Sequence, residues 1–433
     1  MTSSATGHCT APGSGVDHRD TPLATVIGIS AAGMSELPET STARLRTADV
    51  VIGSWRQLNL IDGGISAERR PWPSPLLPSI RPLFEEFAGR RIVVLASGDP
   101  MFHGIGTTLT RIFGADRIEI LPLASSVSLA CAHLGWALDD TAVISLVTQP
   151  ASAIIPLVDQ GRRFLILGRD EKTPGDISEL LSALGHGSAI IRVLSDLGGP
   201  DADVQTHRAD AVTEPRSALN VIAVEPSGGP TRSLAPGLPD ESYATDKGQL
   251  TKTDVRAWTV CTLAPRPGEQ LWDIGGGSGS VAIEWLRATP GTRAITFEKE
   301  PHRRRIISTN AQNLGVPHLE ILGAAPDCFR NADRDPDVVF IGGGLITPGL
   351  VDAVWSRLRP GGRLVANAVT IESEQVLWHH RARRGGRITR MQIASESTIG
   401  GFTALRPALP VTQWRVVKKM GPASTRKREN DTP

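Results

Sequence analysis

Short apolar runs recur along the chain, and each is followed by a turn-like or polar stretch. The first of them are residues 24–29 (ATVIGI), 50–52 (VVI) and 91–96 (RIVVLA). Apolar, β-branched runs bounded by Gly, Pro, Ser or Asp are typical of buried strands. The same pattern predicts further strands at 118–121, 143–146, 164–167, 189–194 and 220–224. Because helix-compatible segments separate these runs, the pattern indicates an α/β fold.

The pattern breaks at residues 226–240 (PSGGPTRSLAPGLPD), where Pro, Gly and Ser dominate. This composition is typical of a linker. A second α/β series follows, with helices expected at 254–263 and 281–287 and strands at 269–274, 294–298, 336–341 and 363–369. We therefore predict a disordered tail at 1–21, a first domain at 22–226, a linker at 227–243, a second domain at 244–420 and a disordered tail at 421–433.

The composition is that of an ordinary globular chain. Its 433 residues carry a formal net charge of +1, which gives no electrostatic reason to expect nucleic acid or a membrane as a partner. No stretch approaches the ~18 apolar residues of a membrane span, and residues 1–20 do not form a secretory signal. Because Cys9, Cys131, Cys261 and Cys328 form no CxxC pair, we expect neither a disulfide framework nor a metal site. These features predict a cytoplasmic protein.

The strongest local motif is residues 273–280 (DIGGGSGS), between an expected strand and an expected helix. Glycines let the backbone approach a ligand closely and turn into the helix. A dinucleotide site would follow the pattern G-x-G-x-x-G. Here the glycines fall at Gly275, Gly277 and Gly279, shortly after Asp273, and this acid-first G-x-G-x-G pattern favours S-adenosylmethionine. A glycine loop needed only for packing remains the alternative.

Other candidate ligands of the same site follow neighbouring strands. One strand ends at Glu298, whose carboxylate could accept hydrogen bonds from a ribose diol. Two later strands end at Gly342-Gly343 and at Asn367. Because ligands of open α/β sheets bind at the carboxyl ends of the strands, these turns should open onto the same site.

Residues 245–420 resemble a small methyltransferase family of the cobalamin pathway, which methylates C15 and decarboxylates the ring C acetate of a precorrin. The matching segments are TKTDVRA, LWDIGGGSGSVAIEW, FEKE, FIGGG, PGGRLVANAV and GGFTAL. The resemblance implies a Rossmann-like domain that contacts S-adenosylmethionine through Thr251, Asp273, Gly275, Gly277, Ser278, Gly279, Glu298, Ala324, Ala325, Gly342, Gly343 and Asn367. The family usually has an acid where this chain has Ala324, a departure that affects one contact with the adenine.

Two cations lie just before the first strand of this domain. Lys252 and Arg256 are near the glycine loop in the predicted fold, and they are candidate anchors for substrate carboxylates. An exposed pair at a helix start is the alternative interpretation. The basic cluster at 302–305 is interpreted as a solvated helix face.

In the first half, the strand at 91–96 runs into the turn Ser97-Gly98-Asp99-Pro100, which alone could be an ordinary loop. The longer stretch 95–106 (LASGDPMFHGIG), together with VIGI at 26–29, resembles the tetrapyrrole methylase family. The resemblance covers residues 22–226 and implies two α/β subdomains that bind S-adenosylmethionine. The implied contacts are Gly28, Gly98, Asp99, Phe102, Gly104, Ser125, Ser126 and Leu219. Ser30, Ala32 and Val147 depart from the family's usual residues.

Both resemblances occur in one chain, in the order of a known fusion family, the precorrin-6Y C5,15-methyltransferases (decarboxylating). They imply one S-adenosylmethionine per domain, a tetrapyrrole substrate, methylation of C5 and C15, and loss of the ring C (C12) acetate carboxyl to give precorrin-8. Because tetrapyrrole methylases are often dimers, we expect a homo-oligomer. Two alternatives stay open: methyl transfer to another tetrapyrrole or small molecule, and a chain in which only the C-terminal half is active. The sequence does not identify the catalytic residues.

Overall fold

The computed structural model describes residues 22–211 and 217–420, and the tails predicted at 1–21 and 421–433 lie outside these residues. The described residues fall into two compact units. Unit 1 takes those within 1–143, 192–205 and 216–222, and unit 2 takes those within 144–191, 206–215 and 223–433. Within the described ranges, no helix is long and apolar enough to cross a membrane.

Unit 1 is built on a five-stranded sheet of order β3-β2-β4-β1-β5. Its strands are β1 (Ala24–Ile29), β2 (Val50–Gly53), β3 (Glu68–Pro71), β4 (Ile92–Ser97) and β5 (Ile118–Leu121). They are parallel, and neighbouring residues of one strand, such as Val26 and Ile27, belong to different buried clusters. Successive side chains of a strand point to opposite faces, so both faces of this sheet are covered.

Helices supply that cover. The helices of unit 1 are α1 (Glu39–Thr47), α2 (Trp55–Asn59), α3 (Leu76–Glu86), α4 (Ile105–Phe113) and α5 (Ser126–Leu134). Leu83 of α3 and Leu109 of α4 pack on one face, and Leu45 of α1 and Leu58 of α2 pack on the other. The carboxyl ends of the strands are left for turns.

A second five-stranded sheet has the order β6-β7-β10-β8-β9. Its strands are β6 (Ala142–Ser145), β7 (Phe164–Leu167), β8 (Ile190–Ser195), β9 (Asp203–Arg208) and β10 (Asn220–Glu225), accompanied by α6 (Ile155–Asp159) and α7 (Thr173–Ala183). The two sheets confirm the predicted pair of α/β subdomains in the N-terminal half.

The C-terminal half contains a seven-stranded sheet of order β13-β12-β11-β14-β15-β19-β16. Its strands are β11 (Gln270–Ile274), β12 (Arg293–Phe297), β13 (Glu320–Leu322), β14 (Val338–Ile341), β15 (Arg363–Ala368), β16 (Arg387–Met391) and β19 (Val411–Val417). Strands β11 to β15 run parallel, whereas β19 is antiparallel to both β15 and β16. This is the predicted Rossmann-like methyltransferase architecture.

Two apolar cores cover the two faces of this sheet. The helices are α8 (Thr253–Leu263), α9 (Ser280–Ala288), α10 (Pro301–Asn313), α11 (Leu350–Arg357) and α12 (Ile371–Arg384). Along β14, Val338 and Phe340 pack with α8, α9 and α10, while Val339 and Ile341 pack with α11 and α12. Because both faces are buried, β14 is apolar throughout, which made it easy to recognise in the sequence.

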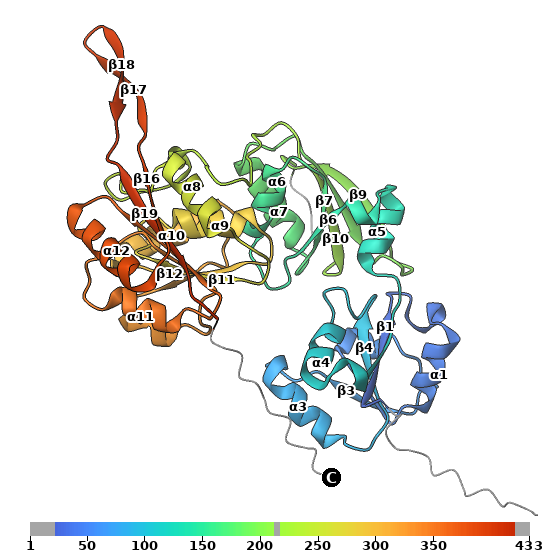
Figure 1. Ribbon diagram of the computed structural model, residues 1–433. Helices are drawn as coiled ribbons and strands as arrows, with labels where there is room; N and C mark the ends of the chain where they lie inside the picture. Colours follow the sequence, from blue (N-terminus) through green and yellow to red (C-terminus); the bar gives the residue numbers. More distant parts are fainter. Residues whose placement is uncertain (1–21, 212–216, 421–433) are drawn as a thin grey trace, which may run out of the picture. The chain divides into compact units, whose positions relative to one another are not determined.

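A two-stranded hairpin projects from this domain. Strands β17 (Ala394–Ile399) and β18 (Phe402–Pro407) pair only with each other and extend away from the sheet between β16 and β19 (Figure 1). We call residues 392–410 the arm. Ile399 is 60% exposed and Phe402 is 80% exposed, so the tip of the arm carries apolar side chains in solvent.

The Pro- and Gly-rich segment between the halves is packed, although its composition indicates a free spacer. Leu238 and Tyr243 belong to the buried core of the C-terminal domain. The backbone N–H of Leu238 and the Tyr243 hydroxyl both donate to Glu284 on α9. The composition marks a break in the pattern, but this segment packs against the C-terminal domain and is not a free spacer.

Unit 2 also joins the second N-terminal sheet to the C-terminal domain. Asp159, at the end of α6, accepts from Arg287 on α9 at 2.8 Å and from Arg232 at 2.8 Å. The side chains of Asp159 and Arg287 are 3% and 1% exposed. Nearby, the Ser152 hydroxyl donates to Gln312 at 2.7 Å. We call Asp159, Arg232 and Arg287 the Asp159 cluster.

Candidate functional site

A cavity of about 1090 Å³ lies at the carboxyl edge of the seven-stranded sheet. Its walls come from five places: the segment before and at the start of α8, the loop after β11, the first turn of α10, the turns after β14 and β15, and the root of the arm. Ligand sites of small molecules commonly measure ~300–1,000 Å³, so this cavity can hold a cofactor together with part of a second ligand. Of the predicted residues, it brings together Thr251, Lys252, Asp273, Gly275, Gly277, Ser278, Gly342, Gly343 and Asn367.

The glycine loop after β11 is shaped by the loop after β14. Gly275 has a φ of +76°, and a Cβ at this position would lie 2.8 Å from the Cα of Gly343. A Cβ at Gly276 would lie 2.1 Å from a methyl carbon of Thr296. Both positions therefore require glycine because neighbouring atoms touch the backbone. Gly277 has open space beside it, so its backbone is accessible from the cavity.

Two buried acids, Asp273 and Glu298, lie next to this loop. Asp273 lines the cavity, and burial raises its pKa to about 7, with a further contribution from the charge of Glu298. Glu298 is 4% exposed and accepts from the N–H of Gly277 at 2.9 Å and from the N–H of Glu300 at 3.0 Å. Glu298 thus ties the loop after β12 to the glycine loop, although its side chain is not part of the cavity wall.

Asn367 is held in place by side chains on both sides. Its amide donates to the Thr259 hydroxyl at 3.0 Å, and its carbonyl oxygen accepts from Gln413 at 2.9 Å. Thr259 is on α8 and Gln413 is on β19, so the end of β15 is fixed to both neighbours. A fixed amide at the cavity wall suits the orientation of a polar ligand.

The prediction that Arg256 anchors substrate is wrong for this structure. Its side chain is 0% exposed, and its guanidinium is paired with Glu284 and Asp240. It also donates to the carbonyls of Thr251 and Leu238 and lies 4.7 Å from the centre of the Tyr243 ring. Arg256 therefore holds the junction segment against α9. Lys252, by contrast, lines the cavity with a side chain that is 66% exposed and 3.3 Å from Asp240.

Three other predicted cofactor residues lie outside the cavity wall. Gly279 caps α9 with a φ of +77° and packs against Ile307. Ala324 accepts from the N–H of Cys328 at 2.9 Å, and Ala325 packs against the apolar core below the loop. Conversely, Arg303 lines the cavity and pairs with Asp246 at 3.2 Å, so the basic cluster at 302–305 is not simply a solvated face.

In unit 1, the ends of β1 and β4 approach each other through glycines. A Cβ at Gly28 would lie 1.9 Å from the carbonyl oxygen of Gly98 and 2.7 Å from the N–H nitrogen of Leu123. Gly98 has a φ of +60° and faces the backbone of Ser125. Because these neighbours are backbone atoms, no side chain could move aside to admit a Cβ at Gly28.

A smaller cavity of about 60 Å³ opens beside these glycines, with Gly98, Ser126 and Leu219 in its wall. Ser125 caps α5 by accepting from the N–H of Ser128. The sequence interpretation missed Arg56, which lines the cavity and donates to the Ser97 hydroxyl at 2.7 Å. Arg56 lies at the start of α2, three residues after the end of β2, and residues that follow parallel strands meet at one edge of a sheet, so that rule could have found it.

The remaining predicted residues of this half shape the turn after β4 and do not line the cavity. Asp99 accepts from the N–H of Met101 at 2.8 Å. Phe102 is 37% exposed, and its ring meets that of His103 edge-on at 4.9 Å. Gly104 precedes α4, and a Cβ there would lie 2.5 Å from the carbonyl oxygen of Pro100. In the described parts of the chain, no group of three or more His, Cys, Asp or Glu side chains could hold a metal ion.

Comparison with known proteins connects both halves to one family. Residues 25–212 match the tetrapyrrole (corrin/porphyrin) methylases, and residues 241–418 match the precorrin methyltransferase domain. A Mycobacterium tuberculosis protein named precorrin-6Y C(5,15)-methyltransferase (decarboxylating) is 47% identical over 399 residues, which cover 91% of this chain and 99% of that protein. The chain belongs to the precorrin-6Y C5,15-methyltransferase family.

Other relatives include a Sinorhizobium protein of the same name, 43% identical over 405 residues that cover 92% of this chain and 97% of that protein. The crystal structure of the C-terminal domain of precorrin-6Y C5,15-methyltransferase from Rhodobacter capsulatus is 43% identical, covers 43% of this chain and 100% of that chain, and has a TM-score of 0.41. As a member of the precorrin-6Y C5,15-methyltransferase family, the chain is an S-adenosylmethionine-dependent methyltransferase.

The raised pKa of Asp273 predicts a pH-dependent cofactor affinity at the C-terminal site. Near pH 6 the buried carboxyl is largely protonated, since its pKa is about 7. A cationic cofactor favours the ionised form, so affinity for S-adenosylmethionine should rise as the pH increases from about 5.5 to 7.5 and then level off. Calorimetry over this range measures the effect.

The control is Asp273→Asn, which removes the titrating group. The difference in pH dependence of cofactor affinity between the unmodified protein and Asp273→Asn reports on the C-terminal site alone, whatever a second site in the chain contributes. The same pH slope in both proteins would contradict the assignment to Asp273. In the absence of cofactor, the sign for stability is opposite: between about pH 4 and pH 7 the unfolded chain has lost a proton that folded Asp273 keeps, so stability falls as the pH rises.

Proposed function

We propose that the chain methylates C5 and C15 of a reduced precorrin-6 and removes the carboxyl group of its ring C acetate, giving precorrin-8 in cobalamin biosynthesis. The observation that carries this proposal is the presence of both methyltransferase halves in one chain that spans 99% of a relative with this activity in its name. The large cavity of the C-terminal domain supports it, because a macrocycle and a cofactor need a site of that size.

The activities are proposed to divide between the halves. We assign C15 methylation and decarboxylation to residues 244–420 and C5 methylation to residues 22–226, with 227–243 as the junction. A shorter relative supports this division: a Pyrobaculum aerophilum protein that covers only 41% of this chain, with 93% of its own length, is named as a probable cobalt-precorrin-6B C(15)-methyltransferase (decarboxylating).

When bound, S-adenosylmethionine would supply a methyl group on a sulfonium, and the reduced macrocycle would supply an electron-rich carbon as nucleophile. In that transfer the methyl carbon would bond to the ring carbon as its bond to sulfur breaks, and sulfur would keep the electron pair. The protein's part is alignment and exclusion of water. In the C-terminal half, the loop at Gly275–Gly277 and the side chain of Asp273 would hold the cofactor, and Glu298 would keep that loop in place through the N–H of Gly277. The fixed amide of Asn367 would orient a polar group of the bound ligand.

The test of the function is the mass of the product. Incubating the full chain with a reduced precorrin-6 and S-adenosylmethionine should add two methyl groups and remove one carbon dioxide. Addition of one methyl with loss of carbon dioxide would show that only the C-terminal half is active. Conversion of a different tetrapyrrole, with none of precorrin-6, would overturn the substrate assignment.

A chain with only the C-terminal half active is the second candidate. Two observations favour it: unit 1 by itself encloses only about 60 Å³ beside its glycines, and Ser30 and Ala32 replace the family's usual residues in the adjacent turn. The Ser30 hydroxyl donates a hydrogen bond to the Glu36 carboxylate at 2.8 Å, so this side chain stabilises the turn. The product mass separates this candidate from the bifunctional one.

The proposed cofactor content is one S-adenosylmethionine per domain. Calorimetry of the full chain should therefore give about two equivalents, and Glu298→Gln should weaken one of them roughly tenfold to hundredfold because charged hydrogen bonds contribute about 1.5–3 kcal/mol. Glu300→Gln is the matched control, since Glu300 is on the same turn and its side chain is 41% exposed, whereas Glu298 is buried. One equivalent in the unmodified protein, or equal losses in both variants, would contradict the proposal.

We also propose a homo-oligomer in the cytoplasm, as the sequence predicts. The apolar tip of the arm supports self-association, because Phe402 and Leu405 are 80% and 71% exposed. Exposed apolar groups of this kind often mark contacts between proteins.

A further inference from the structure

The two strands of the arm pair in a register that sorts their side chains onto two faces. Ser395 is opposite Arg406, and Ser397 is opposite Ala404. Directly opposed residues of an antiparallel pair, and residues two apart on one strand, point to the same face. Ser395, Ser397 and Arg406 therefore share a face, and all three line the large cavity. This face of the arm thus presents two hydroxyls and one guanidinium to the cavity, while Glu396, opposite Leu405 on the other face, also lines it.

The cavity wall contains three cationic side chains, and two of them already have carboxylate partners. Lys252 is 3.3 Å from Asp240, and Arg303 is 3.2 Å from Asp246. Arg406 forms no ion pair with any of the residues that the structure describes. A cation at a cavity wall with no carboxylate of its own is available for an anionic ligand.

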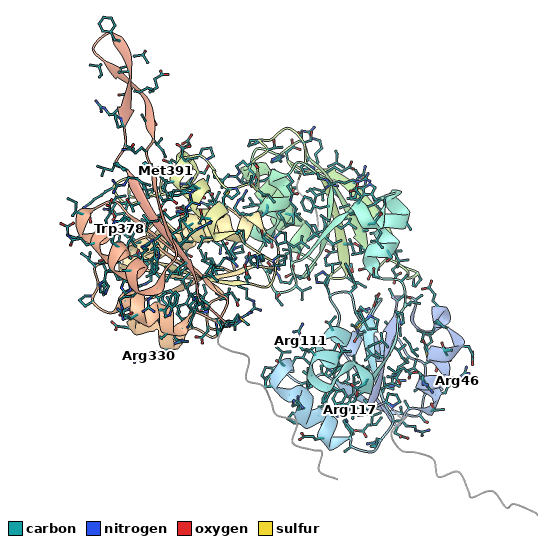
Figure 2. The ribbon with its side chains drawn as sticks, in the orientation of Figure 1. Arg46, Arg111, Arg117, Arg330, Trp378 and Met391 are labelled. Carbon is teal, nitrogen blue, oxygen red and sulfur yellow. The ribbon has the colours of Figure 1, made fainter. Side chains whose placement is uncertain are left out.

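Apolar side chains adjoin Arg406 at the foot of the arm. Met391, Ile393, Leu409 and Val411 line the same cavity, with Met391 at the point where the arm leaves the sheet (Figure 2). An apolar wall beside a free guanidinium matches a large flat ring that carries carboxylates on its rim. The glycine loop and the arm line different parts of the cavity wall, so the arm side is available for the second substrate.

We propose that the arm is part of the tetrapyrrole site and that Arg406 binds a peripheral carboxylate of the macrocycle. This inference rests on the proposed function, since it names the residue that selects a polycarboxylate ring at the C-terminal site. The planar guanidinium can donate two parallel N–H bonds to one carboxylate, which a lysine cannot do. Arg406 is a specificity-determining residue that contacts substrate and takes no part in binding the cofactor.

The test compares Arg406→Gln and Arg406→Lys with the matched control Arg387→Gln. Arg387 starts β16, five strand positions from the arm, and its side chain is exposed outside the large cavity. The KM for the reduced precorrin should rise at least tenfold in Arg406→Gln and less in Arg406→Lys. The affinity for S-adenosylmethionine and the oligomer mass should be unchanged in all three variants.

An unchanged KM in Arg406→Gln would overturn the proposal, and so would a changed oligomer mass, which would make this face of the arm a contact between copies. If the unmodified protein does not convert the precorrin, the proposed function fails separately. Binding of uroporphyrin, a polycarboxylate tetrapyrrole, then tests the role of Arg406 without turnover. Fluorescence titration should give tenfold weaker binding for Arg406→Gln than for Arg387→Gln. Equal binding by the two variants would overturn the role of Arg406.

Discussion

Replacing Asp159 by Ala is expected to lower the free energy of unfolding of unit 2 by roughly 3–5 kcal/mol, the usual cost of leaving one buried charge without its partner. Asp159 is 3% exposed and is the carboxylate that neutralises Arg287, which is 1% exposed, and Arg232. Without it, the carbonyl of Leu314 is the one acceptor left to the Arg287 guanidinium among the described residues. Urea denaturation followed by tryptophan fluorescence measures the change.

Two controls separate this effect from ordinary loss of a surface charge. Asp210→Ala removes a carboxylate from an exposed pair with Arg208, and solvent screening leaves such surface pairs little effect on stability. The double variant Asp159→Leu with Arg287→Met removes both buried charges, so it should be more stable than Asp159→Leu alone. If Asp159→Ala and Asp210→Ala cost the same, the Asp159 cluster does not stabilise unit 2.

Gly28→Ala is expected to abolish C5 methylation and leave C15 methylation and decarboxylation intact. The new Cβ would lie 1.9 Å from the carbonyl oxygen of Gly98, so the ends of β1 and β4 would be forced apart at the predicted cofactor turn. The measured product should then carry one added methyl and lack one carboxyl group. Circular dichroism and the C15 activity show whether the rest of the chain remains folded.

Gly63→Ala is the matched control for this substitution. Gly63 is also in unit 1, and a Cβ there would meet nothing within 4 Å. This variant should make the doubly methylated product at the normal rate. Loss of both methylations in Gly28→Ala would contradict the division of activities, and normal C5 methylation would remove Gly28 from the N-terminal site.

The sequence predicted most of the central strands because burial on both faces makes them apolar. The run 24–29 coincides with β1, and 164–167 coincides with β7. Several of the missed strands are short or polar, although the buried seven-residue strand β19 (VTQWRVV) was missed as well. Strand β3 reads ERRP, β9 reads DVQTHR and β17 reads ASESTI, and β3 and β9 lie at sheet edges. Edge strands bury less side-chain surface, so hydrophobic periodicity carries little information about them.

In the candidate site, too, residues set by local sequence patterns were predictable and residues set by long-range contacts were not. Glycine turns after strands were predictable because their positions follow from the sheet, and the C-terminal cavity contains Gly275, Gly277, Gly342 and Gly343. Arg256 was misjudged because its burial depends on Glu284, 28 residues further along the chain. Arg406 was missed because the arm brings it back to the cavity through strand pairing that no local pattern reveals.

The place where the arm is inserted makes substrate choice separable from methyl transfer. Strands β16 and β19 are hydrogen-bonded neighbours, and their pairing runs to Met391 and Val411, where the arm begins and ends. The pairing of β16 with β19 is complete at these two residues and does not depend on the arm. The length of the arm and its side chains can therefore change without altering the strand order of the sheet that carries the cofactor loop. Related enzymes could therefore evolve to bind other macrocycles through changes in the arm alone. A protein designer could likewise replace the arm with another hairpin between Met391 and Val411.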